Sequence, residues 1–131
     1  TNYAGKVDAA AKALLEEDYD FVYIHVEAPD EMGHQGSVER KVQAIEYLDE
    51  KVIGPMCEKL EQAGADFRML VLPDHPTPIR VRTHTSDNVP YMLYDSTAKQ
   101  DNAWNYNEEE AKNSGNLETV GHKLIDKLLQ L

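Results

Sequence analysis

Three short apolar runs constrain the fold of this chain more than any other feature. They are rich in β-branched and aromatic residues, and they cover residues 21–26, 69–72 and 89–94. Runs of this length and composition predict strands. Because the runs are nearly continuous rather than alternating, they are typical of strands that are buried on both faces of a sheet.

Segments of helical character alternate with these runs, and they cover residues 6–17, 38–63 and 117–129. In the second segment the apolar residues recur at three- and four-residue spacing, as on one face of a helix. Gly54-Pro55 predicts a kink or a division of this helix, and Gly64 predicts its end. The loop between the last two apolar elements is polar, with a short helical turn expected at residues 108–112.

The order helix, strand, helix, strand, strand, helix predicts an α/β fold with helix, sheet and helix layers and a mostly parallel sheet. A length of 131 residues is enough to bury one core. Hydrophobic residues make up 41% of the chain and charged residues 28%, as in ordinary folded proteins. We therefore expect one compact unit, either a domain or part of a larger domain.

The formal net charge of −11 opposes binding to the phosphate backbone of nucleic acid, so no nucleic-acid partner is expected. No apolar run approaches the roughly 20 residues that span a bilayer, so we expect no membrane partner either. Cys57 is the single cysteine, which excludes an intrachain disulfide and favours a cytoplasmic location. An acidic chain can still bind a phosphorylated substrate where cations invert the local field.

Candidate ligands for such cations follow or precede the predicted strands, where ligand sites gather in open α/β sheets. Asp30 and His34 stand four residues apart, so a helical turn would place both on one face. Asp74 and His75 are adjacent, and the prolines beside them favour a turn that directs both to one ion. His84 precedes the third run.

Three histidines and two aspartates form a nitrogen and oxygen set that suits zinc or manganese better than calcium. A two-metal site is the natural chemical interpretation, because ions about 3.5–4 Å apart clamp both oxygens of a phosphoryl transfer. Each motif alone is weak, since an Asp-His pair also occurs as a capping or hydrogen-bonded pair. We expect His25, inside a predicted strand, to pack or hydrogen-bond in the core, and His122, in the last helix, to be a surface or helix-packing residue, rather than either to bind metal.

The ordered motifs Pro29-Asp30-x-x-Gly33-His34, Asp74-His75 and His84-Thr85 resemble the metal-ligand signature of the alkaline-phosphatase superfamily. The sequence around these motifs is similar, more narrowly, to cofactor-independent phosphoglycerate mutases of the archaeal type. The similar segments are HVEAPDEMGHQG, LVLPDHPTPIRVRTHTSDNVPYMLYD and YNEEEAKNSG. The resemblance covers nearly the whole chain, from about residue 2 to residue 131.

This resemblance implies that Asp30, His34 and His84 hold one divalent ion, and that Asp74 and His75 hold a second. The ions would be manganese, zinc or magnesium. In the family a serine accepts the phosphoryl group and returns it to a different hydroxyl of glycerate, so the implied activity is the glycolytic interconversion of 2- and 3-phosphoglycerate. The implied partner is a phosphorylated small molecule.

The nucleophilic serine and an inserted substrate-binding domain of that family lie outside anything matched here. We therefore expect residues 1–131 to be the carboxy-terminal portion of an alkaline-phosphatase-like domain, with no catalytic nucleophile of its own and with the remainder of a longer chain as its partner. Taken alone, the fragment is expected to be inactive.

Three further residues are candidates for supporting roles. Arg80 and Arg82 are able to bind substrate phosphate or carboxylate, because guanidinium groups bind such anions in bidentate geometry. Glu27 is a candidate for orienting a ligand histidine. Two alternatives stay open: another phosphotransferase or phosphatase of the superfamily, such as a homoserine kinase-like protein, and a non-catalytic module with an empty metal site.

Overall fold

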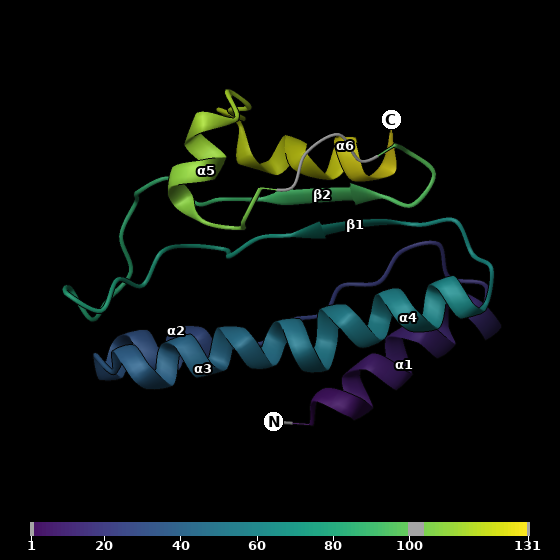
Figure 1. The fold of residues 1–131 in the computed structure, drawn as a ribbon, viewed down its shortest axis with the longest axis horizontal. Coiled ribbons are helices and arrows are strands. Elements are labelled where there is room, and N and C mark those ends of the chain that lie inside the picture. The colour runs from purple at the N-terminus through teal and green to yellow at the C-terminus, as the bar shows by residue number, and fades with distance from the viewer. Residues whose placement is uncertain (1, 100–103, 131) are drawn as a thin grey trace. The chain divides into compact units, whose positions relative to one another are not determined.

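The computed structural model describes residues 2–99 and 104–130, which separate into two compact units (Figure 1). The first unit comprises Thr1–Ala65 and Thr77–Thr85, and the second comprises Asp66–Pro76 and Ser86–Leu131. Each unit has its own packing and is described separately. No helix in the described ranges is long and apolar enough to cross a bilayer.

The first unit is helical, and its elements are α1 (Tyr3–Glu16), α2 (Ala28–Gln35), α3 (Val38–Leu48), η1 (Asp49–Ile53) and α4 (Gly54–Gln62). Helix α1 packs along η1 and α4, and α2 packs against α3. The buried residues at the first of these contacts include Val7, Ala10 and Ala11 of α1 together with Met56 and Leu60 of α4. Small side chains on α1 let the two helices approach closely.

Elements α3, η1 and α4 form one long rod, as Figure 1 shows. Ser37 caps its start by accepting a hydrogen bond from the Arg40 backbone N–H, a role that serine often has at helix N-termini. Pro55 has no N–H to donate, and the rod accommodates it with a π turn in which Gly54 N–H bonds the Asp49 carbonyl. Gly64, at φ +69°, ends the rod. The irregularity predicted at Gly54-Pro55 is present as a π turn over Asp49–Ile53, and the helix continues through it without a division.

The prediction of a strand at residues 21–26 is wrong for this structure, which gives the segment no regular hydrogen-bonded form. Exposure still alternates along it: Phe21 and Tyr23 are exposed, while Val22 and Ile24 are half-buried. With α1, the segment lines an open groove of about 570 Å³. A strand requires a partner for its backbone N–H and C=O groups, and the described residues of the first unit contain no strand.

The second unit contains β1 (Arg68–Val71), β2 (Met92–Asp95), α5 (Glu108–Asn113), η2 (Gly121–Lys123) and α6 (Leu124–Leu129). The strands pair antiparallel with Arg68 opposite Asp95, and α6 packs on β1. The α/β class is therefore as predicted, whereas the sheet formed by the described residues has two antiparallel strands and no parallel pair.

The helical turn predicted near residue 108 is confirmed by α5, which Asn107 caps through its side chain. The last helix is shorter than predicted, because regular structure begins only at Gly121. Ahead of it, Val120 N–H bonds the Glu118 carboxylate, a local contact that competes with helical hydrogen bonding.

Candidate metal centre

Helix α2 places the first two candidate ligands on one face. Pro29 lies in its first turn, where a missing N–H costs nothing, and the helix ends at Gly36 with φ +70°. Asp30 and His34 are one turn apart, and His34 Nε2 lies 3.4 Å from Asp30 Oδ2. The helical turn predicted from the Asp-x-x-x-His spacing is therefore present.

The loop Thr77–Thr85, which belongs to the same unit, brings His84 to this pair. His84 Nε2 lies 3.2 Å from Asp30 Oδ1 and 3.3 Å from His34 Nε2. One ligand atom from each of the three residues lies within 4.8 Å of the others. Asp30 is half-buried while both imidazoles are exposed, so the cluster opens to solvent.

The spacing of these atoms fits a metal ion. Zinc–nitrogen distances of about 2.0–2.1 Å in a tetrahedral site imply that neighbouring ligand atoms are about 3.3–3.4 Å apart. The two imidazole nitrogens are 3.3 Å apart, which matches this spacing, and each lies beside a different oxygen of the Asp30 carboxylate, His84 Nε2 at 3.2 Å from Oδ1 and His34 Nε2 at 3.4 Å from Oδ2. Two imidazole nitrogens and a carboxylate are also the donor types that zinc and manganese accept. The residues present therefore fit a divalent cation.

The backbone of the loop fixes which nitrogen of His34 is available. His34 Nδ1 lies 3.0 Å from the carbonyl oxygen of Arg82. A carbonyl only accepts hydrogen bonds, so Nδ1 is the donor in this contact, and in the neutral imidazole the lone pair of Nε2 faces the cluster. Metal-binding histidines in proteins are usually oriented by a bond of this kind.

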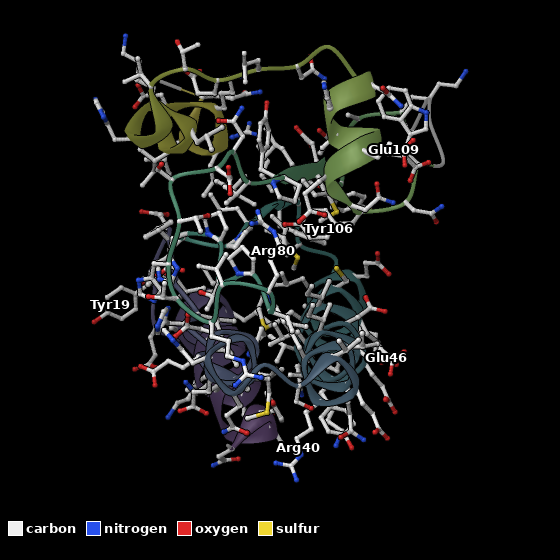
Figure 2. All side chains as sticks on the ribbon, turned by 90° about the vertical axis from the view of Figure 1, so that its left-hand side faces the viewer. Tyr19, Arg40, Glu46, Arg80, Tyr106 and Glu109 are labelled. Atoms are coloured by element: carbon white, nitrogen blue, oxygen red, sulfur yellow. The ribbon has the colours of Figure 1, made fainter. Side chains whose placement is uncertain are left out.

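The loop also contacts α2 through the Arg82 side chain. A Cβ built on Gly36 would lie 2.3 Å from Arg82 Nε, so the guanidinium group packs over this glycine. Arg82 itself has φ 57°. Arg80, the other candidate for binding an anion, is exposed and lies in the same turn of the loop as Arg82 (Figure 2). The anion-binding roles of both arginines stay predictions.

Asp74 and His75 lie in the second unit, just after β1. The His75 backbone N–H donates to Asp74 Oδ1 at 3.1 Å, and His75 Nε2 lies 3.4 Å from the same oxygen. The chain therefore turns so that both side chains meet. Within the described residues the pair joins no cluster of three potential ligands, and its role at a second ion stays a prediction.

Glu27 occupies the N-cap position of α2, and its Oε1 lies 3.8 Å from His25 Nε2. The His25 Nδ1 atom is in turn 3.3 Å from the Tyr23 hydroxyl. Glu27 therefore lies beside His25, which is not one of the candidate ligands. That Glu27 orients a ligand histidine stays a prediction.

Sequence reasoning missed two contacts of the cluster. One is the Arg82 carbonyl, which leaves no trace in a sequence because every residue has a carbonyl group. The other is Thr77, whose hydroxyl donates to Asp30 Oδ1 at 2.5 Å. Its position between Pro76 and Pro78 was the available signal, since two prolines restrict the conformation of the residue between them.

Comparisons with known proteins agree with this chemistry. Residues 1–130 match the family model described as Metalloenzyme superfamily. The 2,3-bisphosphoglycerate-independent phosphoglycerate mutase of Methanothrix thermoacetophila is 48% identical over 98% of this chain and 32% of its own length. A probable enzyme of the same name from Geobacter sulfurreducens is 45% identical over 98% of this chain and 32% of its own length.

Among solved structures, the PH0037 protein from Pyrococcus horikoshii is similar, with a TM-score of 0.82 at 26% identity over 99% of this chain and 38% of that chain. The chain thus spans about a third of the length of the curated relatives it matches. Because the family match extends over residues 1–130, the chain belongs to the metalloenzyme superfamily.

Proposed function

We propose that this chain is the metal-binding, carboxy-terminal portion of a 2,3-bisphosphoglycerate-independent phosphoglycerate mutase. The whole protein would interconvert 2- and 3-phosphoglycerate through a phosphoserine intermediate. The observation that carries the proposal is the convergence of Asp30, His34 and His84 on one position. The names of relatives 45–48% identical to this chain supply the reaction.

Two divalent ions, manganese, zinc or magnesium, would serve this reaction. A bound ion neutralises charge on the transferring phosphoryl group and lowers the pKa of the serine nucleophile. Asp30, His34 and His84 would hold one ion, and the Arg82 carbonyl would keep His34 in the tautomer that binds it. Asp74 and His75 would supply ligands to the second ion.

Other residues of this chain would bind substrate or orient ligands. Arg80 and Arg82 would bind the phosphate or carboxylate of phosphoglycerate, for which a planar guanidinium group is well suited. Glu27 would orient a ligand histidine. The serine nucleophile and the substrate-binding domain would come from the remainder of a longer, cytoplasmic chain.

We also propose that the parallel sheet forms in the whole protein and includes residues 21–26. Two observations support this. The exposed fractions of Phe21 and Tyr23 are 43% and 72%, so these aromatic side chains have space for further packing. The relatives are also about three times as long as this chain, which leaves room for further strands.

The test is an assay of the full-length gene product for interconversion of 2- and 3-phosphoglycerate with manganese present. We expect turnover, and we expect His34→Ala to abolish it. Glu46→Gln is the matched control, because Glu46 is a carboxylate on the solvent-facing side of α3 (Figure 2). Absence of interconversion by the wild type in manganese would refute the mutase assignment. Turnover by the isolated 131-residue chain would refute the placement of the nucleophile outside it.

A further inference from the structure

Thr77 stands out because its side chain is polar and nevertheless buried. Thr77 is 4% exposed, and among the residues that the structure describes it is the only one with a polar side chain that is buried. Burying a hydroxyl group without a hydrogen bond costs free energy, so such a group is expected to have a defined partner. The Thr77 hydroxyl donates to Asp30 Oδ1 at 2.5 Å, across 47 residues of sequence.

Two further contacts hold Thr77 in place. Lys41 Nζ, from α3, donates to the Thr77 carbonyl oxygen at 2.7 Å. On α2, a Cβ at Gly33 would lie 2.5 Å from the same carbonyl oxygen and 2.9 Å from the Thr77 methyl group. Only glycine permits this approach of the loop to the helix. The position of the Thr77 hydroxyl is therefore set by two helices.

The bond acts on the oxygen that faces His84. Asp30 Oδ1 accepts from Thr77 and lies 3.2 Å from His84 Nε2, while Oδ2 lies 3.4 Å from His34 Nε2. The terminal torsion of an aspartate is broad, so an unrestrained carboxylate samples many orientations. A hydrogen bond from a fixed donor selects one of them.

We propose that Thr77 is the positioning residue for Asp30, and that its hydroxyl holds the carboxylate in the orientation that binds the ion. This inference rests on the proposed function, since it assumes that Asp30, His34 and His84 hold a divalent cation. Loss of a hydrogen-bonding partner of a metal ligand weakens metal binding by about 10–100-fold. The hydroxyl, rather than the volume of the side chain, is the group that matters.

Manganese and cobalt affinities of the full-length protein, measured by calorimetry, test the inference. Thr77→Val keeps the shape and removes the hydroxyl, and it should weaken binding by about 10–100-fold. Thr77→Ser keeps the hydroxyl and should restore the affinity to within about threefold of the wild type. The visible absorption of bound cobalt should change in Thr77→Val and return in Thr77→Ser, because it reports ligand geometry. Should Thr77→Val fail to fold, Thr77→Ala carries the same comparison.

Thr97→Val is the matched control, because the Thr97 hydroxyl also donates to an aspartate, Asp95, at 2.7 Å in the second unit. It should leave metal affinity unchanged. An affinity of Thr77→Val within about twofold of the wild type, or equal weakening by Thr77→Ser, would overturn the role of Thr77. His34→Ala separates the proposed metal site from the proposed role of Thr77. If His34→Ala binds metal as well as the wild type, the assignment of the metal site is wrong. If His34→Ala loses metal affinity and Thr77→Val retains it, only the role of Thr77 is rejected.

Discussion

The two nitrogens of His34 face different parts of the first unit, because Nδ1 is bonded to the Arg82 carbonyl at 3.0 Å while Nε2 faces Asp30 and His84. The residue that orients this imidazole does so with its backbone. Its side chain is left to act elsewhere, over Gly36 at the end of α2.

His34→Ala is expected to weaken manganese binding by more than about 100-fold, because it removes a ligand rather than a partner of a ligand. His122→Ala is the control, since His122 is an exposed histidine in η2 of the second unit. Calorimetric titration of both variants with manganese measures the difference. Unchanged metal content in His34→Ala would remove this residue from the site.

Arg82→Ala should separate metal binding from substrate binding. The carbonyl that bonds His34 remains in the variant, so the affinity for manganese is expected to stay within about threefold of the wild type. If the guanidinium group binds substrate, KM for phosphoglycerate in the full-length protein rises by about 10–100-fold, as expected for loss of a charged hydrogen bond. A large loss of metal affinity with unchanged KM would contradict this division of roles.

Gly36→Ala and Gly64→Ala form a matched pair, because both glycines have a positive φ, of +70° and +69°. Alanine at either position is strained by about 1 kcal/mol. Only Gly36 is also crowded, by Arg82 Nε at 2.3 Å from a built Cβ, whereas the space at Gly64 is open. Chemical denaturation should therefore show a larger loss of stability for Gly36→Ala, and equal losses would show that Arg82 moves away without cost.

The Tyr106 hydroxyl should lose its proton at a higher pH than an ordinary tyrosine, because its pKa is raised. Partial burial, and then the nearby Glu108 carboxylate, raise its pKa to about 12, and its hydroxyl donates to the Pro90 carbonyl at 3.0 Å. Because the folded-state pKa is raised, the stabilisation is complete below the unfolded value of about 10 and is lost as pH rises through about 12. Ultraviolet absorbance of tyrosinate, compared between wild type and Tyr106→Phe, follows this step.

Tyr106→Phe should also cost about 1 kcal/mol at neutral pH, since it removes one hydrogen bond to a buried residue. A difference titration centred near pH 10 would show that the phenol is solvated and would refute the assignment.

Local patterns predicted the parts of the fold that depend on nearby residues. The four-residue spacing of Asp30 and His34 and the glycine that ends α4 act within a turn or two of helix, so both are visible in the sequence. The run at residues 21–26 shows the limit of such patterns. Its composition favours a strand, but a strand forms only beside a partner, and partners are not encoded in the run itself.

The candidate site also has features that the sequence predicts and features that only the structure shows. Residue types and order pointed to His84, but only the folded loop shows it 3.3 Å from His34. The contributions of Thr77 and of the Arg82 carbonyl depend on burial and on backbone position, which a single sequence does not reveal.

The candidate ligands His34 and His84 are 50 residues apart in the chain, and this separation determines when during folding the cluster is complete. Closing a loop of that length costs conformational entropy before any contact across it is gained. Of the three candidate ligands in the first unit, only the local pair Asp30 and His34 is therefore available to an ion until the loop has docked. Metal is expected to slow unfolding far more than it speeds folding, because the ion binds fully only to the structure in which the loop is already docked.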